Sequence, residues 1–267
     1  VDILNDLPSK TGNYYIHRQD GKIIFIGNSK NIKKRVNQHF TSITTSAKKI
    51  QNEVFTVTYE ETGSELIALL KEVEEIKINK PIYNRMSRKN SLGWAIYAEK
   101  DSNGYLNLKL QKADGRKKEI TAFVNEKEGK SAIFRITSSY NLCQKFTGLY
   151  PTKNECFQHA TNECDGACIG KITPKEYNAR VQVFIDKNLF ENKNMIIIDK
   201  GRSIHEHSAI LIEKGILKGY TFYDLNYQVT NIEVLKNILV PLPINRDTKH
   251  IIQNYLRKNK VLKIINF

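Results

Sequence analysis

Long apolar runs, acidic residues and dispersed cysteines are all scarce in this sequence, and each scarcity excludes a class of protein. No apolar run approaches the roughly 20 residues that a membrane-spanning helix needs, and no signal peptide opens the chain. Asp and Glu number 28 against 42 Lys and Arg, which gives a net charge of +14. We therefore expect a soluble intracellular protein with no membrane partner, and the charge favours nucleic acid as a partner over simple solubility. The chain begins with Val1 and not with Met, so we also expect a fragment or a processed form.

Cysteine is missing from the chain except in one segment. The four cysteines follow the spacing C-x12-C-x7-C-x3-C and are Cys143, Cys156, Cys164 and Cys168. Disulfides are disfavoured in a chain that looks intracellular, and the C-x2-C knuckle typical of structural zinc does not occur in this segment. The clustering favours a shared ligand, and four thiolates suit an iron–sulfur cluster. Zinc and reduced structural thiols remain the alternatives.

The stretch that organises the rest of the chain is residues 12–40. It contains two runs of β-branched and aromatic residues, 13–18 and 22–26, which predict two short strands. They are joined at Asp20-Gly21, a dipeptide that favours a tight hairpin because Gly tolerates a positive φ. A strand hairpin is therefore expected near the start of the chain.

A basic helix is expected directly after this hairpin, ending at about His39, with Ser29 or Asn31 as its N-cap. Its apolar residues recur at fourfold spacing and are Ile32, Val36 and Phe40. The basic residues outside this stripe are Lys30, Lys33, Lys34 and Arg35. One edge of the helix is thus predicted to carry positive charge beside the hairpin, as a DNA-binding surface would.

A second helix is predicted over residues 65–79, because Ser64 or Thr62 can cap its start and Pro81 stops it. Glu72 lies at the border of its apolar stripe, where a carboxylate can reach a cleft without entering the core. An ordinary surface glutamate is the alternative, since Glu74 and Glu75 are close by in the sequence.

These residues together resemble the GIY-YIG nuclease family. The matching positions are Gly12-Asn13-Tyr14, Phe25-Ile26-Gly27, Arg35, Glu72 and Asn84. The resemblance implies that Tyr14 acts as a general base toward water, that Arg35 binds phosphate, and that Glu72 holds Mg²⁺ or Mn²⁺. It also implies that Asn84 belongs to the catalytic site.

Two positions depart from the family pattern. Phe25 stands where tyrosine is usual, and Asn28 stands where many close relatives have lysine. A free tyrosine has a pKa of about 10 and is a poor base at neutral pH without help, so these changes threaten the rate more than binding. His39, four residues past Arg35, is predicted to be a reserve base, with a helix-surface residue as the alternative.

The chain as a whole is predicted to be α+β, with four successive regions. A small GIY-YIG sheet-and-helix domain spans residues 1–90, a β-rich region 91–142, the four-cysteine segment 143–170, and a C-terminal α+β region 171–267. In the last region a helix is expected from Pro174 to about Leu189, followed by three strand-like runs, a helix and a short strand.

The cysteine segment is similar to the one that follows the GIY-YIG domain in excinuclease C and its Cho-like relatives, which implies an iron–sulfur cluster on the four cysteines. Nearly the whole chain resembles the C-terminal half of bacterial polymerase III epsilon-like exonuclease/GIY-YIG proteins. That resemblance implies a cytoplasmic, nucleoid-associated bacterial protein, other repair or replication proteins as partners, and an N-terminal exonuclease domain that is missing here.

Three functions are compatible with these observations. The first is a divalent-metal-dependent DNA endonuclease that hydrolyses a phosphodiester in damage- or structure-directed DNA repair, such as nucleotide excision repair. The second is a catalytically impaired GIY-YIG module that binds DNA without cutting it, because of Phe25 and Asn28. The third is a protein-interaction scaffold in which the cysteine centre only stabilises the middle of the chain.

Overall fold

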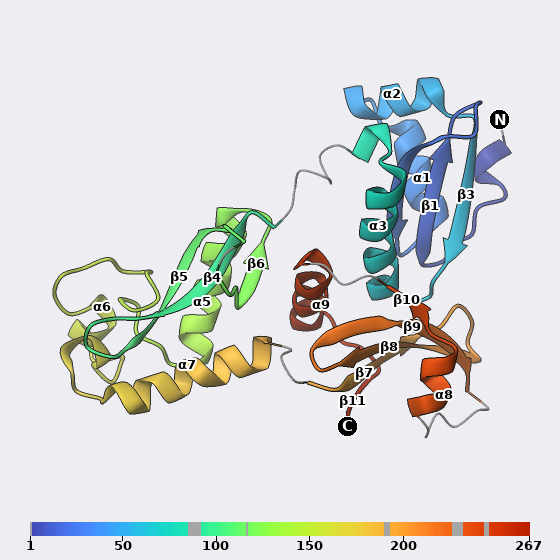
Figure 1. Ribbon diagram of the computed structural model, residues 1–267. Helices are drawn as coiled ribbons and strands as arrows, with labels where there is room; N and C mark the ends of the chain where they lie inside the picture. Colours follow the sequence, from blue (N-terminus) through green and yellow to red (C-terminus); the bar gives the residue numbers. More distant parts are fainter. Residues whose placement is uncertain (1, 85–91, 116, 190–192, 226–231, 243–245) are drawn as a thin grey trace. The chain divides into compact units, whose positions relative to one another are not determined.

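The computed structural model describes residues 2–84, 92–115, 117–189, 193–225, 232–242 and 246–267 (Figure 1). The chain divides into two compact units. The first unit joins Val1–Lys89 with Glu191–Phe267, and the second is Asn90–Phe190. Helices and antiparallel sheets occur in both units, so the α+β class is confirmed. Among the described helices, none is both long enough and apolar enough to cross a membrane.

These units differ from the four regions expected from the sequence. Helix α7 (Pro174–Asn188), expected in the C-terminal region, belongs to the second unit, while the rest of that region joins the first. The physical reason is that the apolar face of α7, including Tyr177 and Phe184, is buried in the same core as Leu108 and Ile133. The predicted boundary at residues 90 and 91 lies outside the described residues.

The N-terminal sheet has the order β2-β1-β3, with both pairs antiparallel. Its strands are β1 (Gly12–His17), β2 (Ile23–Ser29) and β3 (Thr56–Glu61). The predicted turn is present, with Gly21 at φ 82° and its N–H donating to the carbonyl of Arg18. Strand β3 follows α2 (Thr45–Glu53) after two residues.

Helices cover both faces of this sheet (Figure 1). On one face, the predicted stripe of α1 (Ile32–Thr41) buries Ile32 and Val36 in a core with Tyr14, and Asn31 caps the helix. On the other face lies α3 (Glu65–Asn79), whose bounds match the prediction. A short 3-10 helix, η1 (Asp2–Leu4), precedes the sheet, and η2 (Ile82–Asn84) follows α3.

The C-terminal part of the first unit is a five-stranded antiparallel sheet of order β10-β9-β8-β7-β11. Its elements are β7 (Met195–Lys200), β8 (Glu206–Glu213), β9 (Ile216–Asp224), α8 (Ile232–Asn237), β10 (Val240–Pro241), α9 (Arg246–Lys258) and β11 (Lys263–Asn266). It is tied to α3: the Ser64 hydroxyl that caps α3 donates to the buried Asp199 carboxylate at 2.8 Å, and Lys71 Nζ donates to the Tyr220 hydroxyl at 3.3 Å. The helix that carries Glu72 is thus held from both sheets of its unit.

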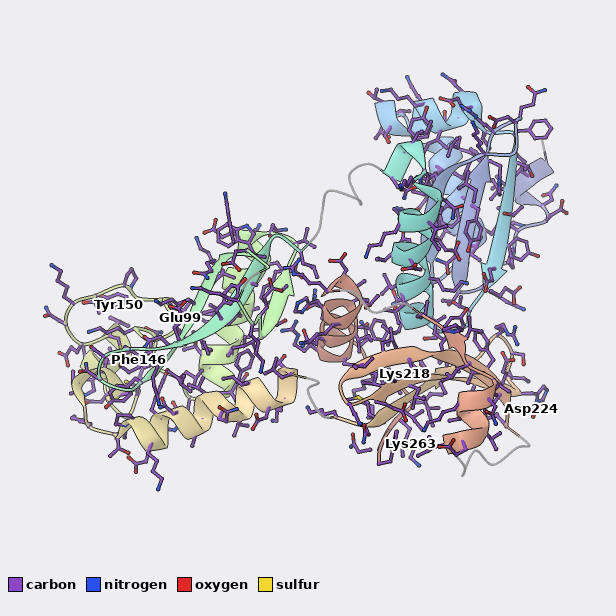
Figure 2. All side chains as sticks on the ribbon, in the orientation of Figure 1. Glu99, Phe146, Tyr150, Lys218, Asp224 and Lys263 are labelled. Atoms are coloured by element: carbon purple, nitrogen blue, oxygen red, sulfur yellow. The ribbon has the colours of Figure 1, made fainter. Side chains whose placement is uncertain are left out.

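The second unit is built on a three-stranded sheet of order β5-β4-β6. Its elements are β4 (Trp94–Lys100), β5 (Leu106–Lys112), β6 (Thr121–Phe123), α5 (Glu126–Ser139), α6 (Phe157–Ala160), the 3-10 helix η3 (Ala167–Ile169) and α7. On β4, Glu99 pairs with Lys109 and Lys117, both at 2.7 Å (Figure 2). Phe146, labelled in the same figure, belongs to the core that also contains Cys143.

Candidate active site

Tyr14 is buried, and its hydroxyl lies against Gly27 of β2. It is directly opposite Gly27 in the β1–β2 pair, and its side chain is 1 % exposed. A Cβ atom added to Gly27 would lie 2.4 Å from the Tyr14 hydroxyl oxygen. Glycine is therefore required at position 27 because the ring of Tyr14 occupies the space of a side chain.

The Tyr14 hydroxyl is paired with His39, the last-turn histidine of α1. The distance from Tyr14 Oη to His39 Nε2 is 2.7 Å. The Phe25 ring packs against the imidazole edge-on, with ring centroids 4.9 Å apart, and Gln51 Nε2 donates to the His39 carbonyl at 2.7 Å. His39 is thus fixed on the hydroxyl of Tyr14, and the position of Phe25 is filled by packing instead of a second phenol.

Burial sets the charge state of this pair. Burial raises the pKa of Tyr14 above its usual range, an effect that the nearby Arg35 guanidinium partly offsets. Burial, and secondarily the charge of Arg35, lowers the pKa of His39 to about 4. At neutral pH both groups are therefore uncharged, and the imidazole is free to accept a proton.

Arg35 is the common electrostatic neighbour of the site. Its charge lowers the pKa of Tyr14, of His39 and of Glu72. The side chain is exposed on α1, and its Nη1 donates to Gln38 Oε1 at 3.1 Å. An exposed guanidinium beside a tyrosine and a carboxylate is well placed to receive a phosphate.

Glu72 is held by a residue that the sequence analysis treated only as a loss. Asn28 Nδ2 donates a hydrogen bond to Glu72 Oε2. Burial raises the pKa of Glu72, while this hydrogen bond and the charge of Arg35 lower it. Asn28 pairs with Asn13 across the two strands, and Asn13 donates to the Ala68 carbonyl of α3 at 2.9 Å, so both asparagines contact the helix that carries Glu72.

The predicted site asparagine, Asn84, supports a strand. It is 2 % exposed, its Oδ1 accepts from the N–H of Ile26 at 2.9 Å, and its Nδ2 donates to the Ile26 carbonyl at 2.8 Å. These two bonds imitate a neighbouring strand and fix the free edge of β2. Through β2, Asn84 positions Gly27 and Asn28.

The basic edge of α1 is only partly neutralised. Lys30 forms an ion pair with Glu65 at 3.2 Å. For Lys33, Lys34 and Arg35 no ion pair is found within the part of the chain that the structure describes. These three cations therefore remain available to phosphate groups, and Arg35 is the one that neighbours Tyr14.

The donor set around Glu72 can be compared with the needs of a metal ion. Within the described ranges, the one group of three or more His, Cys, Asp or Glu ligands is made of cysteines. Glu72 does not belong to a group of that size, and its own carboxylate is the ligand that it offers. Mg²⁺ is commonly bound by one or two carboxylates together with waters and substrate phosphates. Glu72 fits a cation of this kind, and a substrate phosphate and waters would complete the coordination of that cation.

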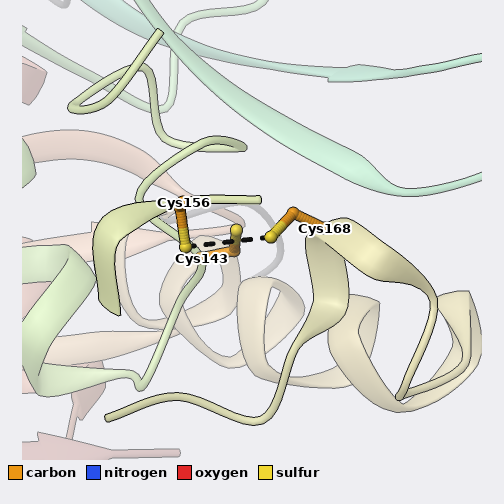
Figure 3. Close-up of side chains that lie close together, drawn as sticks. All are labelled: Cys143, Cys156 and Cys168. Carbon is orange, nitrogen blue, oxygen red and sulfur yellow. Dashed lines mark hydrogen bonds between the residues drawn. The ribbon is translucent and has the colours of Figure 1, made fainter. Parts of the chain in front are cut away.

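The cysteine segment brings three thiols together (Figure 3). The sulfur atoms of Cys143, Cys156 and Cys168 all lie within 4.8 Å of one another, and Cys168 is 3.7 Å from Cys156. Cys164 lies outside this group, although its thiol interacts with that of Cys156. Three converging thiols with a fourth nearby fit a thiolate-bound metal.

Cys143 and Cys164 lie in loops, Cys156 caps α6 and Cys168 lies in η3, and α7 braces this segment. Arg180 Nη2 pairs with Asp165 at 2.6 Å, and its Nη1 donates to the Asn141 carbonyl at 3.1 Å. Burial raises the pKa of the Cys143 thiol to about 12. Burial also acts to raise the pKa of Cys156, but the main-chain N–H of His159 and the neighbouring thiols outweigh it and lower that pKa.

Comparison with known proteins identifies two segments of the chain. Residues 10–85 match the model of the UvrC-like GIY-YIG domain, and residues 94–187 match the model of the UvrC/Cho excinuclease middle domain. The C-terminal sheet lies outside both matches.

Individual relatives agree with these two matches. Excinuclease cho of Escherichia coli K12 is 28 % identical over 187 residues, which cover 69 % of this chain and 63 % of that protein. The UvrABC system protein C of Methanococcus maripaludis is 26 % identical over 229 residues, which cover 80 % of this chain and 41 % of that protein. The match thus spans less than two thirds of the length of these relatives.

Among solved structures, the magnesium-bound GIY-YIG N-terminal endonuclease domain of UvrC from Thermotoga maritima is 24 % identical, with a TM-score of 0.30. The match covers 31 % of this chain and 92 % of that one. The two family matches and the relatives lead to one conclusion: the chain carries a UvrC-like GIY-YIG domain followed by a UvrC/Cho middle domain, and it is homologous to the Cho and UvrC excinucleases.

Proposed function

We propose that this protein is a DNA endonuclease that hydrolyses a phosphodiester with the help of Mg²⁺ or Mn²⁺ and makes damage- or structure-directed incisions in excision repair. The observation that carries the proposal is the convergence of Tyr14, His39, Arg35 and Glu72 at one edge of β2. The names of its relatives, excinuclease cho and UvrABC system protein C, support the same reaction. The proposed place of action is the bacterial cytoplasm, at the nucleoid.

Tyr14 and His39 would handle the proton of the attacking water. The Tyr14 oxygen takes a proton from water while its own hydroxyl hydrogen passes to His39 Nε2, 2.7 Å away. The imidazole is neutral at pH 7, so its Nε2 lone pair can accept that proton, and the lowered pKa of about 4 makes His39 a weaker base than a free histidine. The pair therefore avoids forming a free phenolate, which the raised pKa of Tyr14 opposes.

Arg35 would bind the scissile phosphate. Its planar guanidinium suits two phosphate oxygens and stabilises the charge that develops on them in the transition state. Lys33 and Lys34 lie beside it on α1 and would hold the flanking backbone. Binding should therefore weaken steeply with salt.

Glu72 would hold the cation, with Asn28 orienting the carboxylate through its hydrogen bond. When bound, the cation would polarise the phosphate and stabilise the leaving 3′-oxygen. Asn28 contributes no charge, so it cannot lower the pKa of Tyr14 as a lysine would. Arg35 is left as the cation that does so.

The specific observation that favours the alternative, a DNA-binding module without cleavage, is the position of Phe25. Its ring packs on His39 and offers no hydroxyl to the water or the phosphate. In that case Arg35 and the α1 lysines would still grip DNA.

For the middle unit we infer a metal centre on Cys143, Cys156, Cys164 and Cys168. An iron–sulfur cluster is our first assignment and zinc the second. Other repair or replication proteins remain predicted partners.

The test is cleavage of nicked, flapped, branched and lesion-bearing duplexes with Mg²⁺ or Mn²⁺. Wild type should cut at least one substrate, and Glu72→Ala should not, although it still binds DNA. Glu74→Ala, two residues along the same helix, is the matched control and should cut normally. Tight, salt-sensitive binding without cleavage by the wild type would favour the binding module.

A further inference from the structure

Tyr177 of α7 carries a buried hydroxyl without a partner. The side chain is 1 % exposed, and its hydroxyl oxygen forms no hydrogen bond with any residue that the structure describes. Leaving a hydroxyl buried and unpaired is unfavourable, because the group loses its bonds to water and gains none in return. A buried hydroxyl donor without an acceptor indicates that a group bound to the protein supplies the acceptor.

The ring of Tyr177 is held firmly, so the hydroxyl cannot turn out to solvent. It packs edge-on against Phe146, with centroids 5.2 Å apart, and against Tyr105 at 5.9 Å. Tyr105 is the matched contrast within this aromatic group, because its hydroxyl donates to the Ile172 carbonyl at 2.7 Å. Two tyrosines of one core thus differ in whether the hydroxyl has an acceptor.

The Tyr177 side chain borders the cysteine centre. Tyr177, Cys143, Cys164 and Arg180 all line one cavity of about 10 Å³. The main-chain N–H of Cys143 and the cysteine side chains are close enough to affect the pKa of Tyr177. An N–H and a guanidinium are donors, so neither can accept the hydroxyl hydrogen, whereas thiolate sulfur can.

We propose that Tyr177 donates its hydroxyl hydrogen to a sulfur atom of the metal centre held by the four cysteines. Tyr177 is then a positioning residue of that centre, not a ligand of it. Hydrogen bonds to sulfur stabilise the negative charge of bound thiolates and raise the reduction potential of iron–sulfur clusters. The inference rests on the proposed metal centre and is independent of nuclease activity.

The proposal predicts that the effect of Tyr177→Phe changes sign with metal. In the metal-free protein the variant removes an unpaired buried hydroxyl, so its melting temperature should equal or exceed that of the wild type. In the metal-loaded protein the same variant loses a hydrogen bond and should melt at a lower temperature. Tyr105→Phe removes a satisfied bond and should lower the melting temperature in both forms.

The experiment uses the full chain as purified with its metal, and compares wild type, Tyr177→Phe and Tyr105→Phe. Release of iron or zinc to EDTA is followed with time, together with melting before and after metal removal. Tyr177→Phe should release metal about tenfold faster than the wild type. Tyr105→Phe should release it at the wild-type rate. Should metal-free protein melt without a cooperative transition, the release rates alone decide.

Two results would overturn the inference. Equal release rates for Tyr177→Phe and wild type would show that the hydroxyl does not touch the centre. Destabilisation by Tyr177→Phe with and without metal would instead show a trapped water as the partner, which the cavity is just large enough to hold. A wild-type protein that carries no metal would reject both this inference and the metal centre, and would leave the nuclease proposal standing.

Discussion

The site at β2 and the site in the cysteine segment differ in how many of their polar side chains have partners within the protein. At β2, Tyr14 is paired with His39, Glu72 with Asn28, and Asn84 with the strand backbone. In the cysteine segment, three thiols converge from a loop and two short helical turns, and a buried hydroxyl beside them has no partner among the described residues. The first site sits on strands and longer helices, whereas the second sits on a loop and short helical turns.

For the metals proposed above, this difference corresponds to two ways of holding a cation. The β2 site is preorganised, so a metal there would add chemistry to a geometry that already exists. The cysteine site resembles a structural site, where metal binding and local folding are one event. One buried polar atom near the first site departs from this rule: Asn13 Oδ1 has no partner within the described ranges.

The largest effect is expected for a substitution of Glu72, and it tests the contrast between the two sites. Glu72→Gln keeps the shape of the side chain but removes the charge that holds a cation, so cleavage should fall about 1,000-fold, as expected for a loss of several kcal/mol of transition-state stabilisation. Melting should change little, because the β2 site does not fold on its metal. Glu74→Gln serves as the control, and a large melting shift in Glu72→Gln would contradict the contrast between the two sites.

Cys156→Ser should have the opposite profile. Replacing a thiolate by a hydroxyl removes a metal ligand, so the purified protein should contain little iron or zinc and the middle unit should lose stability. Metal content by elemental analysis and calorimetry would measure both effects. If metal content stayed at the wild-type level, Cys156 would not be a ligand.

Gly27→Ala should damage the β2 site by packing alone. The new Cβ would lie 2.4 Å from the Tyr14 hydroxyl, and overpacking of this kind costs about 1–3 kcal/mol of the free energy of unfolding. Chemical denaturation would measure the loss. In a double-mutant cycle, Gly27→Ala should cost much less free energy of unfolding in the Tyr14→Ala background than in the wild type. Additive losses would show that the two residues are not in contact.

Asn28→Ala should have a smaller effect, because it removes orientation and not a ligand. We expect about a tenfold weaker affinity for Mn²⁺, as is usual when a residue that orients a metal ligand is removed. Mn²⁺ binding by electron paramagnetic resonance would report it. Asn31→Ala, which removes only the cap of α1, should leave Mn²⁺ affinity unchanged.

A further prediction concerns pH. The pKa of His39 is about 4 in the folded protein and near 6.5 when unfolded, so the unfolded chain binds more protons between these values. Stability should therefore fall as pH drops from 6.5 toward 4, and His39→Gln should flatten this slope. Unfolding at several pH values would test it, and an unchanged slope in the variant would exclude His39 as the source.

The parts of the fold that could be predicted from the sequence are those set by local pattern. The bounds of α3 follow from Ser64, the apolar stripe and Pro81, and His39 follows Arg35 by one helical turn. The spacing of the cysteines predicted a shared site, and three of the four thiols do lie close together.

Long-range pairings could not be predicted in this way. Asn28 and Glu72 lie 44 residues apart, and Ser64 and Asp199 lie 135 apart. Such contacts depend on how elements stack and leave no periodic signal in either segment. For the same reason the sequence placed α7 with the C-terminal region and not with the middle unit.

The first unit is made of two distant stretches of chain, with Asn90–Phe190 inserted between them. Both ends of this insert are joined to the first unit. When the insert unfolds, it becomes a flexible loop of about 100 residues whose two ends the folded first unit must hold together. Closing such a loop carries an entropic cost on the order of 4 kcal/mol. If the cysteines hold the proposed metal, its loss would then weaken the unit that holds Tyr14 and Glu72 through chain connectivity.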